Sequence, residues 1–190
     1  MMNADTQITL DQYYVAVVTD ISGRFPVFRT VEFDRGDMDR QPPPVPACLL
    51  EITEFEDDGE NDPGTGSWQC NARVEARIIF GFRTERVKLQ CRKLATALAH
   101  FLRMRRFGHP EKPASALPTG PALLTGCYED EFSPELYKYE VWRVEWIQNM
   151  TFGPSIWNED GEAPKRIHSG FAPDIGTGNE SRYDTISEEK

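Results

Sequence analysis

Hydrophobic positions near the start of the chain follow helical spacing. Between residues 10 and 23, apolar side chains recur every three or four positions, as they do on one face of a helix. Thr9 stands before this stretch with Gln12 three residues later, which is the pattern of a capping box, and Gly23 is suited to end the helix. The pattern therefore predicts a helix over residues 10–23, although the valines in its middle also favour a strand.

Three strands are predicted next, over residues 25–33, 45–55 and 72–82. The first begins beside Pro26, which suits an edge strand because proline cannot donate to a ladder of hydrogen bonds. The third is the clearest, since apolar side chains occupy every second position from Ala72 to Phe82. Residues 57–67 are rich in glycine and acidic side chains, so we expect the second and third strands to form a long hairpin with an acidic tip.

The second half of the chain predicts one long helix and two further strands. Residues 85–106 carry a buried stripe at helical spacing, with Thr84 as a possible cap and Gly108 and Pro110 beyond its end. Strands are expected over residues 122–128 and 139–152. Short connections between these elements favour neighbouring, antiparallel strands. The fold class is therefore α+β, with a mostly antiparallel β-sheet and two main helices packed on one of its faces. The last strand places a set of large apolar side chains on one face: Trp142, Val144, Trp146 and Met150.

The character of the sequence changes after residue 152. Residues 153–190 contain five glycines, three prolines and few aliphatic side chains, with Trp157, Phe171 and Tyr183 spaced among them. Such a segment is too polar to build a core of its own. We therefore divide the chain into an α+β domain over residues 1–152 and a polar, extended C-terminal arm or tail over residues 153–190. The arm either hangs free or lies along another surface with its aromatic side chains as anchors.

Composition and charge narrow the range of functions that the chain can have. The formal net charge is −10, which repels nucleic acid unless the basic residues are segregated. No stretch approaches 18 apolar residues, and the N-terminus lacks the pattern of a secretory signal, so we expect no membrane partner. The four cysteines lie more than twenty residues apart, without the close pairs of a zinc site, which predicts reduced and mostly buried thiols and no cofactor. These cysteines are Cys48, Cys70, Cys91 and Cys127.

Acidic residues are concentrated at the expected hairpin tip. Seven carboxylates fall within twelve positions, from Glu51 to Asp62. A metal-dependent nuclease would need such carboxylates fixed on strands with a lysine nearby, and the facing strand offers Arg73, Glu75 and Arg77 but no lysine. The chain also lacks a phosphate-binding loop and a nucleophile elbow. The sequence therefore predicts no catalytic residues and no metal ligands.

Basic residues are concentrated around the long helix. Eight of the 21 lysines and arginines lie between Arg83 and Arg106, with only Glu85 opposing them. Three interpretations remain open: contact with nucleic acid, a solvated helix face, or contact with the acidic tip of a neighbouring copy, which generates a head-to-tail assembly. The third predicts these subunit-interface residues, with two aromatic residues of the arm included: Arg83, Arg86, Lys88, Arg92, Lys93, Glu56, Asp57, Asp58, Glu60, Asp62, Trp157 and Phe171.

Several phrases of the sequence resemble a known family. The run from Pro46 to Ile52, followed by an acidic loop, resembles the tail terminator (tail completion) proteins of long-tailed bacteriophages. The strand over residues 72–82 that leads into a long helix is similar to the same family. Further similar phrases are Val141–Gln148, Gly153–Trp157 and Phe171–Gly176.

The resemblance implies a small α+β fold assembled as a homo-oligomeric, hexameric ring without catalytic activity. Such a ring caps the tail tube and joins it to the head-side connector, so the implied partners are copies of itself, the tail tube protein and the head–tail connector protein. DNA would pass through the lumen without specific binding. The implied localisation is the neck of the virion, after assembly in the host cytoplasm. Another neck protein, involved in head completion or associated with the sheath, is the nearest alternative.

Overall fold

The computed structural model describes residues 8–34, 43–60, 64–112, 114–130, 139–154, 166–173 and 175–188. The chain divides into two compact units, Met1–Ile156 and Trp157–Lys190, which are described separately. The division falls a few residues after the position at which the composition of the sequence changes.

The larger unit contains one five-stranded sheet with strand order β1-β2-β3-β5-β4. Only β1 and β2 pair in parallel, and the other neighbours are antiparallel. The predicted α+β class, with its mostly antiparallel sheet and its hairpin of β2 and β3, is confirmed. The elements are α1 (Leu10–Arg24), β1 (Thr30–Phe33), β2 (Ala47–Asp57), β3 (Trp68–Gly81), α2 (Val87–Leu102), β4 (Leu123–Glu129) and β5 (Tyr139–Phe152).

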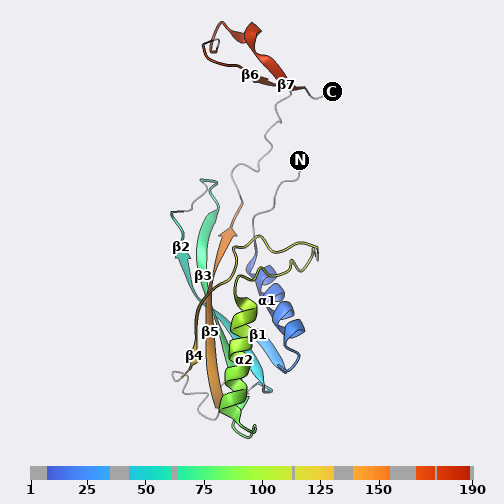
Figure 1. Ribbon diagram of the computed structural model, residues 1–190, viewed down its shortest axis with the longest axis vertical. Coiled ribbons are helices and arrows are strands. Elements are labelled where there is room, and N and C mark those ends of the chain that lie inside the picture. The colour runs from blue at the N-terminus through green and yellow to red at the C-terminus, as the bar shows by residue number, and fades with distance from the viewer. Residues whose placement is uncertain are drawn as a thin grey trace. The chain divides into compact units, whose positions relative to one another are not determined.

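Both helices cover the same face of this sheet (Figure 1). Alternate side chains of β3, such as Val74, Ala76 and Ile78, point into this layer and are completely buried. They pack with Trp146 of β5 and with the apolar stripes of α1 and α2 in one continuous core. Burial of this apolar area is the main source of the fold's stability. No helix among the described residues covers the opposite face of the sheet (Figure 1).

A buried network of hydrogen bonds connects α1 to β5. The Tyr13 hydroxyl donates to Gln148 Oε1 at 2.8 Å, and Gln148 Nε2 donates to the Thr119 hydroxyl at 3.1 Å and to the Gly120 carbonyl at 2.9 Å. Both Tyr13 and Gln148 are completely buried. Because every one of these polar groups has a partner, the network fixes the position of α1 without leaving a desolvated group unsatisfied.

The start of α1 agrees with the sequence. Thr9 caps the helix through the Gln12 backbone N–H, and the Gln12 side chain accepts from the Thr9 N–H, so the predicted capping box is present. The helix ends at Arg24, one residue beyond Gly23. The alternative of a strand in this region is wrong, because the capped first turn and the buried stripe both favour the helix.

The first predicted strand is too long. Residues 25–29 form a turn in which the Phe25 N–H donates to Ile21 and the Phe28 N–H donates to Phe25, so β1 begins only at Thr30. The reason is tertiary: Phe25 caps α1 and its ring packs edge-on against Phe101, with ring centroids 5.5 Å apart. The contact between the buried Phe25 ring and the partly buried Phe101 ring holds this segment against the helices and keeps it out of the sheet.

The long helix is shorter than predicted at both ends. Its N-cap is Arg86, in a left-handed conformation with no side-chain hydrogen bond, so Thr84 is not the cap. The helix stops at Leu102, because the following residues leave it to bond with the segment before β4. There the Met104 N–H donates to Ala122, and the Ala122 N–H donates to Arg105. This pairing replaces the last helical turn that the pattern predicted.

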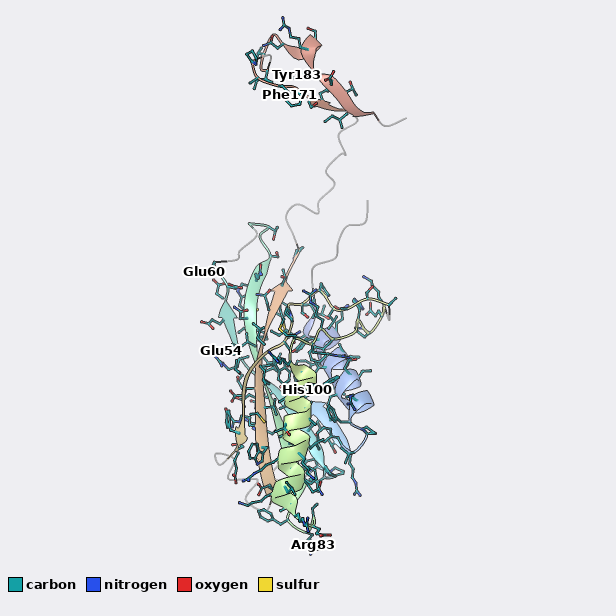
Figure 2. The ribbon with its side chains drawn as sticks, in the orientation of Figure 1. Glu54, Glu60, Arg83, His100, Phe171 and Tyr183 are labelled. Carbon is teal, nitrogen blue, oxygen red and sulfur yellow. The ribbon has the colours of Figure 1, made fainter. Side chains whose placement is uncertain are left out.

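The smaller unit has a two-stranded antiparallel sheet of β6 (Arg166–Ser169) and β7 (Asp184–Glu188), with a short 3-10 helix at Glu180–Arg182. The sequence did not predict this sheet. Tyr183 organises the loop, since its hydroxyl accepts from the Gly176 N–H at 2.7 Å and its ring lies where a side chain on Gly170 would clash. Phe171 is 79% exposed (Figure 2). Trp157 lies outside the described residues.

Candidate functional surfaces

The open face of the sheet carries a network of ion pairs beside a second, smaller cluster of buried apolar side chains, which consists of Ala47, Leu49, Ile79 and Val141. Arg77 and Arg143 lie directly opposite each other on β3 and β5, where two like charges would repel. Asp130 lies within ion-pair distance of both, at 3.4 Å from Arg77 Nε and 3.1 Å from Arg143 Nη2, and its side chain is completely buried. Glu75 pairs with both arginines as well, at 3.3 and 3.2 Å. The charges of this face are therefore compensated within the chain.

Two peripheral carboxylates complete this network. Glu51 of β2 pairs with Arg77 at 2.8 Å, and Glu145 of β5 pairs with Arg143 at 3.6 Å and accepts from the Tyr128 hydroxyl. Burial raises the pKa of the Glu75 carboxyl above its ordinary value, although the two arginines act in the opposite direction. The network has the composition of a structural element, since each charged group faces a partner of opposite sign.

The acidic hairpin tip, which we define as Glu54–Glu60 together with Trp68, has a different character. Asp57 accepts from the Trp68 indole N–H at 2.8 Å, and Asp58 accepts from the Asn149 amide at 2.9 Å. Glu56 and Glu60 are exposed, and neither forms an ion pair with a described residue. Asp62, which was predicted to belong to this surface, lies outside the described residues.

Three aromatic rings meet beside these carboxylates. The ring centroids of Phe55, Trp68 and Phe152 are separated by 5.8–6.1 Å. Phe55 is 36% exposed and Trp68 is 45% exposed. The hairpin tip thus combines uncompensated negative charge with exposed aromatic surface, a combination that is typical of protein-binding surfaces.

The basic residues of α2 form two separate stripes. Lys88 and Arg92 point toward β4, where both pair with Glu129, at 3.7 and 3.5 Å. Arg92 also lies over the Trp142 ring, 5.3 Å from its centroid. Lys93 lies on another side of the helix and forms no ion pair with any residue that the structure describes. The single basic patch that the sequence suggested is therefore partly neutralised within the chain.

Two further arginines lie at the beginning of α2. Arg83 is exposed in the turn before the helix, without an ion pair among the described residues. Arg86 is exposed at the N-cap, and its one ion pair with a described residue is with its neighbour Glu85, at 3.9 Å. Such an exposed pair adds little stability, so the charge of Arg86 remains available to a partner.

A groove beside α2, which we call the α2 groove, lies next to Lys93. Its floor is apolar, and its volume is about 350 Å³. Val27 on its rim is half exposed. Most of the lining comes from the turn after α1, the end of β3 and one side of α2: Phe25, Val27, Phe80, Gln90, Lys93 and Leu94.

The acidic and basic surfaces lie far apart on the larger unit. Figure 2 shows Glu54 and Glu60 toward one end of this unit and Arg83 at the other. The described interface candidates thus fall into separate groups: Glu56, Asp57, Asp58 and Glu60 at the hairpin tip, Arg83 and Arg86 just before α2, and Lys93 along it. Lys88 and Arg92 join an ion cluster within the chain instead. Phe171 belongs to the smaller unit.

Sequence reasoning missed the residues of the open face and of the α2 groove. Asp130 carries no sequence signal, because its importance depends on the pairing of β4 with β5. The alternation of Arg143 and Glu145 with apolar residues of the last strand could have indicated a charged sheet face. The groove is formed by three segments that are distant in sequence.

Among the described residues, no group of three or more histidine, cysteine or acidic side chains is placed to hold a metal ion. Burial raises the pKa of Cys48 and Cys91 to about 12, so these thiols stay protonated at neutral pH and are poor nucleophiles. No helix among the described residues is long and apolar enough to cross a membrane.

Comparison with known proteins adds no further assignment. No family model matches the chain, and no curated protein matches it either.

Proposed function

We propose that this chain is a structural subunit that assembles with copies of itself and acts without catalysis. The observation that carries the proposal is the separation of uncompensated charge on one compact unit. Negative charge and exposed rings lie at the hairpin tip, whereas Arg83, before α2, and Lys93, along it, carry positive charge that no described acidic residue pairs with. Complementary surfaces at different places on one molecule bind head to tail, and such contacts close into a ring when the rotation between copies allows it.

The particular structure we propose is a tail terminator ring at the head-proximal end of a phage tail. The α+β fold with an acidic hairpin agrees with the resemblance of residues 46–52 and 72–82 to that family. In this role the ring, for which we propose six copies, caps the tail tube protein and later joins the head–tail connector protein. DNA passes through its lumen without specific binding. Another neck protein of the virion would share the same assembly chemistry and would differ in the partner it binds.

Sedimentation of the purified full-length chain, alone and with tail tubes, tests this proposal. We expect a concentration-dependent oligomer, and co-sedimentation with tubes at one end. A chain that stays monomeric at every concentration and ignores the tubes would contradict the proposal.

A nuclease assay provides the complementary test. We expect no cleavage of DNA in the presence of magnesium or manganese, because the carboxylates of the hairpin that the structure describes are not gathered into a metal site. Cleavage that disappears in Glu51→Ala would overturn the structural role in favour of a metal-dependent enzyme.

A further inference from the structure

The α2 groove has the properties of a site for an aromatic side chain with a neighbouring carboxylate. Its floor consists of Phe25, Phe80 and Leu94, and its polar rim consists of Gln90 and Lys93. Its volume of about 350 Å³ falls in the lower range of pockets that bind small organic groups. The Lys93 ammonium has no partner within the described chain, so it can pair with an incoming acid.

The hairpin tip offers this combination of groups. Phe55 and Trp68 are large, partly exposed rings, and the Asp57 carboxylate lies against the Trp68 indole at 2.8 Å. Aromatic side chains of this kind are enriched among the residues that dominate binding energy at interfaces. The negative charge of Glu56 and Glu60 on the same tip is opposite in sign to the charge of Lys93, which lines the groove. Arg83 and Arg86, which precede α2, add positive charge to the same unit.

The hairpin tip of a chain cannot fill the groove of the same chain. Trp68 begins β3, and Phe80, which lines the groove, stands twelve residues later on the same strand. At a rise of 3.2–3.4 Å per residue these positions are about 40 Å apart. Only a second copy can bring the two surfaces together.

We propose that the hairpin tip of one copy docks in the α2 groove of the next, with Trp68 or Phe55 on the apolar floor and Asp57 paired with Lys93. This inference rests on the proposed function and deepens it, because it names the two surfaces through which the copies bind. The contact is heterologous, because the tip of each copy binds the groove of the next. The rotation between neighbouring copies decides whether they form a closed ring or an open filament.

Photo-crosslinking of the full-length chain tests this docking directly. A benzoylphenylalanine replaces Trp68, the oligomer is irradiated, and the crosslinked peptides are identified by mass spectrometry. We expect crosslinks between copies that end within residues 25–27 and 80–97. The same probe at Leu123, which is 52% exposed on β4, serves as the control and should not label the groove. Crosslinks from position 68 to other surfaces only would overturn the docking.

Charge reversal provides a second measurement. Lys93→Glu should raise the dissociation constant of the oligomer by roughly three- to tenfold, as expected for placing like charges at a contact. Lys88→Glu is the matched control, because Lys88 lies on the stripe that pairs with Glu129, and it should change assembly less. Restoration of assembly in the double variant Lys93→Glu with Asp57→Lys supports the pairing. If Lys93→Glu and the control Lys88→Glu weaken assembly equally, the pairing is contradicted.

The results separate this inference from the proposed function. The docking is overturned, and the structural role stays intact, if rings form but the crosslinks from position 68 end outside the α2 groove. The same holds if rings form and Lys93→Glu leaves the dissociation constant of the oligomer unchanged. A chain that remains monomeric under all conditions overturns both. Crosslinks into the α2 groove within filaments that never bind tail tubes support the docking and contradict the tail terminator role.

Discussion

The two faces of the five-stranded sheet differ in what stabilises them and in what they leave available. The covered face buries Val74, Ile78 and Trp146 under both helices. The open face compensates Arg77 and Arg143 with carboxylates from three strands and from the residue after β4. Most charged and apolar groups of both faces are paired or buried within the chain, although Arg77 Nε and Arg143 Nε donate no hydrogen bond to a described residue. The surfaces with unused charge and exposed rings lie toward the ends of the sheet, at the hairpin tip and beside α2.

The largest effect is expected on the covered face. Trp146→Ala removes a completely buried indole and opens a cavity in the core, so it should lower the free energy of unfolding by about 3–5 kcal/mol. Urea titration followed by fluorescence of the remaining tryptophans measures this change. A loss below about 1 kcal/mol would show that the helices do not pack on this face as described.

The central carboxylate of the open face should give the next largest effect. Asp130→Asn removes one of the two carboxylates that pair with both Arg77 and Arg143, whose side chains are 25% and 16% exposed, and leaves Glu75 as their shared counter-charge. Removal of one partner of a buried pair is strongly destabilising, and partial exposure reduces the cost here to about 2–3 kcal/mol. The same urea titration measures it. An unchanged midpoint would mean that the ion network contributes no stability.

Alkaline pH should affect the covered face in particular. Burial raises the pKa of Cys48 and Cys91 to about 12 and that of Cys70 to about 11, from an ordinary value of 9.0. Unfolded thiols lose their protons near pH 9 whereas the folded thiols keep them, so unfolding releases protons and stability falls as the pH rises above 9. Each thiol should contribute about 1 kcal/mol of this loss near pH 9.5–10.

The variant Cys48→Ala isolates one of these contributions. Its stability relative to the unmodified chain is measured by urea titration at pH 7 and again at pH 9.5. The stability difference between the two chains should shrink at the higher pH, because the variant lacks one thiol that ionises only on unfolding. A difference that is the same at both pH values would contradict the burial of Cys48.

The smallest effect is expected at the exposed margin of the open face. Arg73 pairs with Glu54 at 3.2 Å, but both side chains are more than one third exposed. Exposed pairs contribute little, so Arg73→Ala should cost less than about 1 kcal/mol. A loss as large as that of Asp130→Asn would remove the distinction between the compensated centre of this face and its margin.

Local pattern was sufficient to predict the elements whose burial follows the sequence period. The strand over residues 139–152 has the bounds that its alternation predicted, and the capping box of α1 is present. The start of β3 was misplaced by four residues, because pairing of Trp68 with Phe152 extends the ladder beyond the alternating stretch. The prediction of the last turn of α2 was wrong for a similar reason, because residues 104 and 105 form hydrogen bonds with Ala122.

The candidate surfaces were predictable only in part. The acidic tip could be found from composition, because all its carboxylates lie close together in the chain. The separation of the basic residues of α2 into a paired stripe and an exposed one could not be predicted. It depends on Glu129 of β4, which lies beside Lys88 and Arg92 but away from Lys93. The α2 groove needs the positions of Phe25 and Phe80 in space, which no local pattern contains.

Negative-stain electron microscopy of the concentrated full-length chain, with and without tail tubes, tests the central claim most directly. The account predicts closed rings of identical copies, found free or seated at one end of the tubes. Fields that contain single copies alone under both conditions would contradict it.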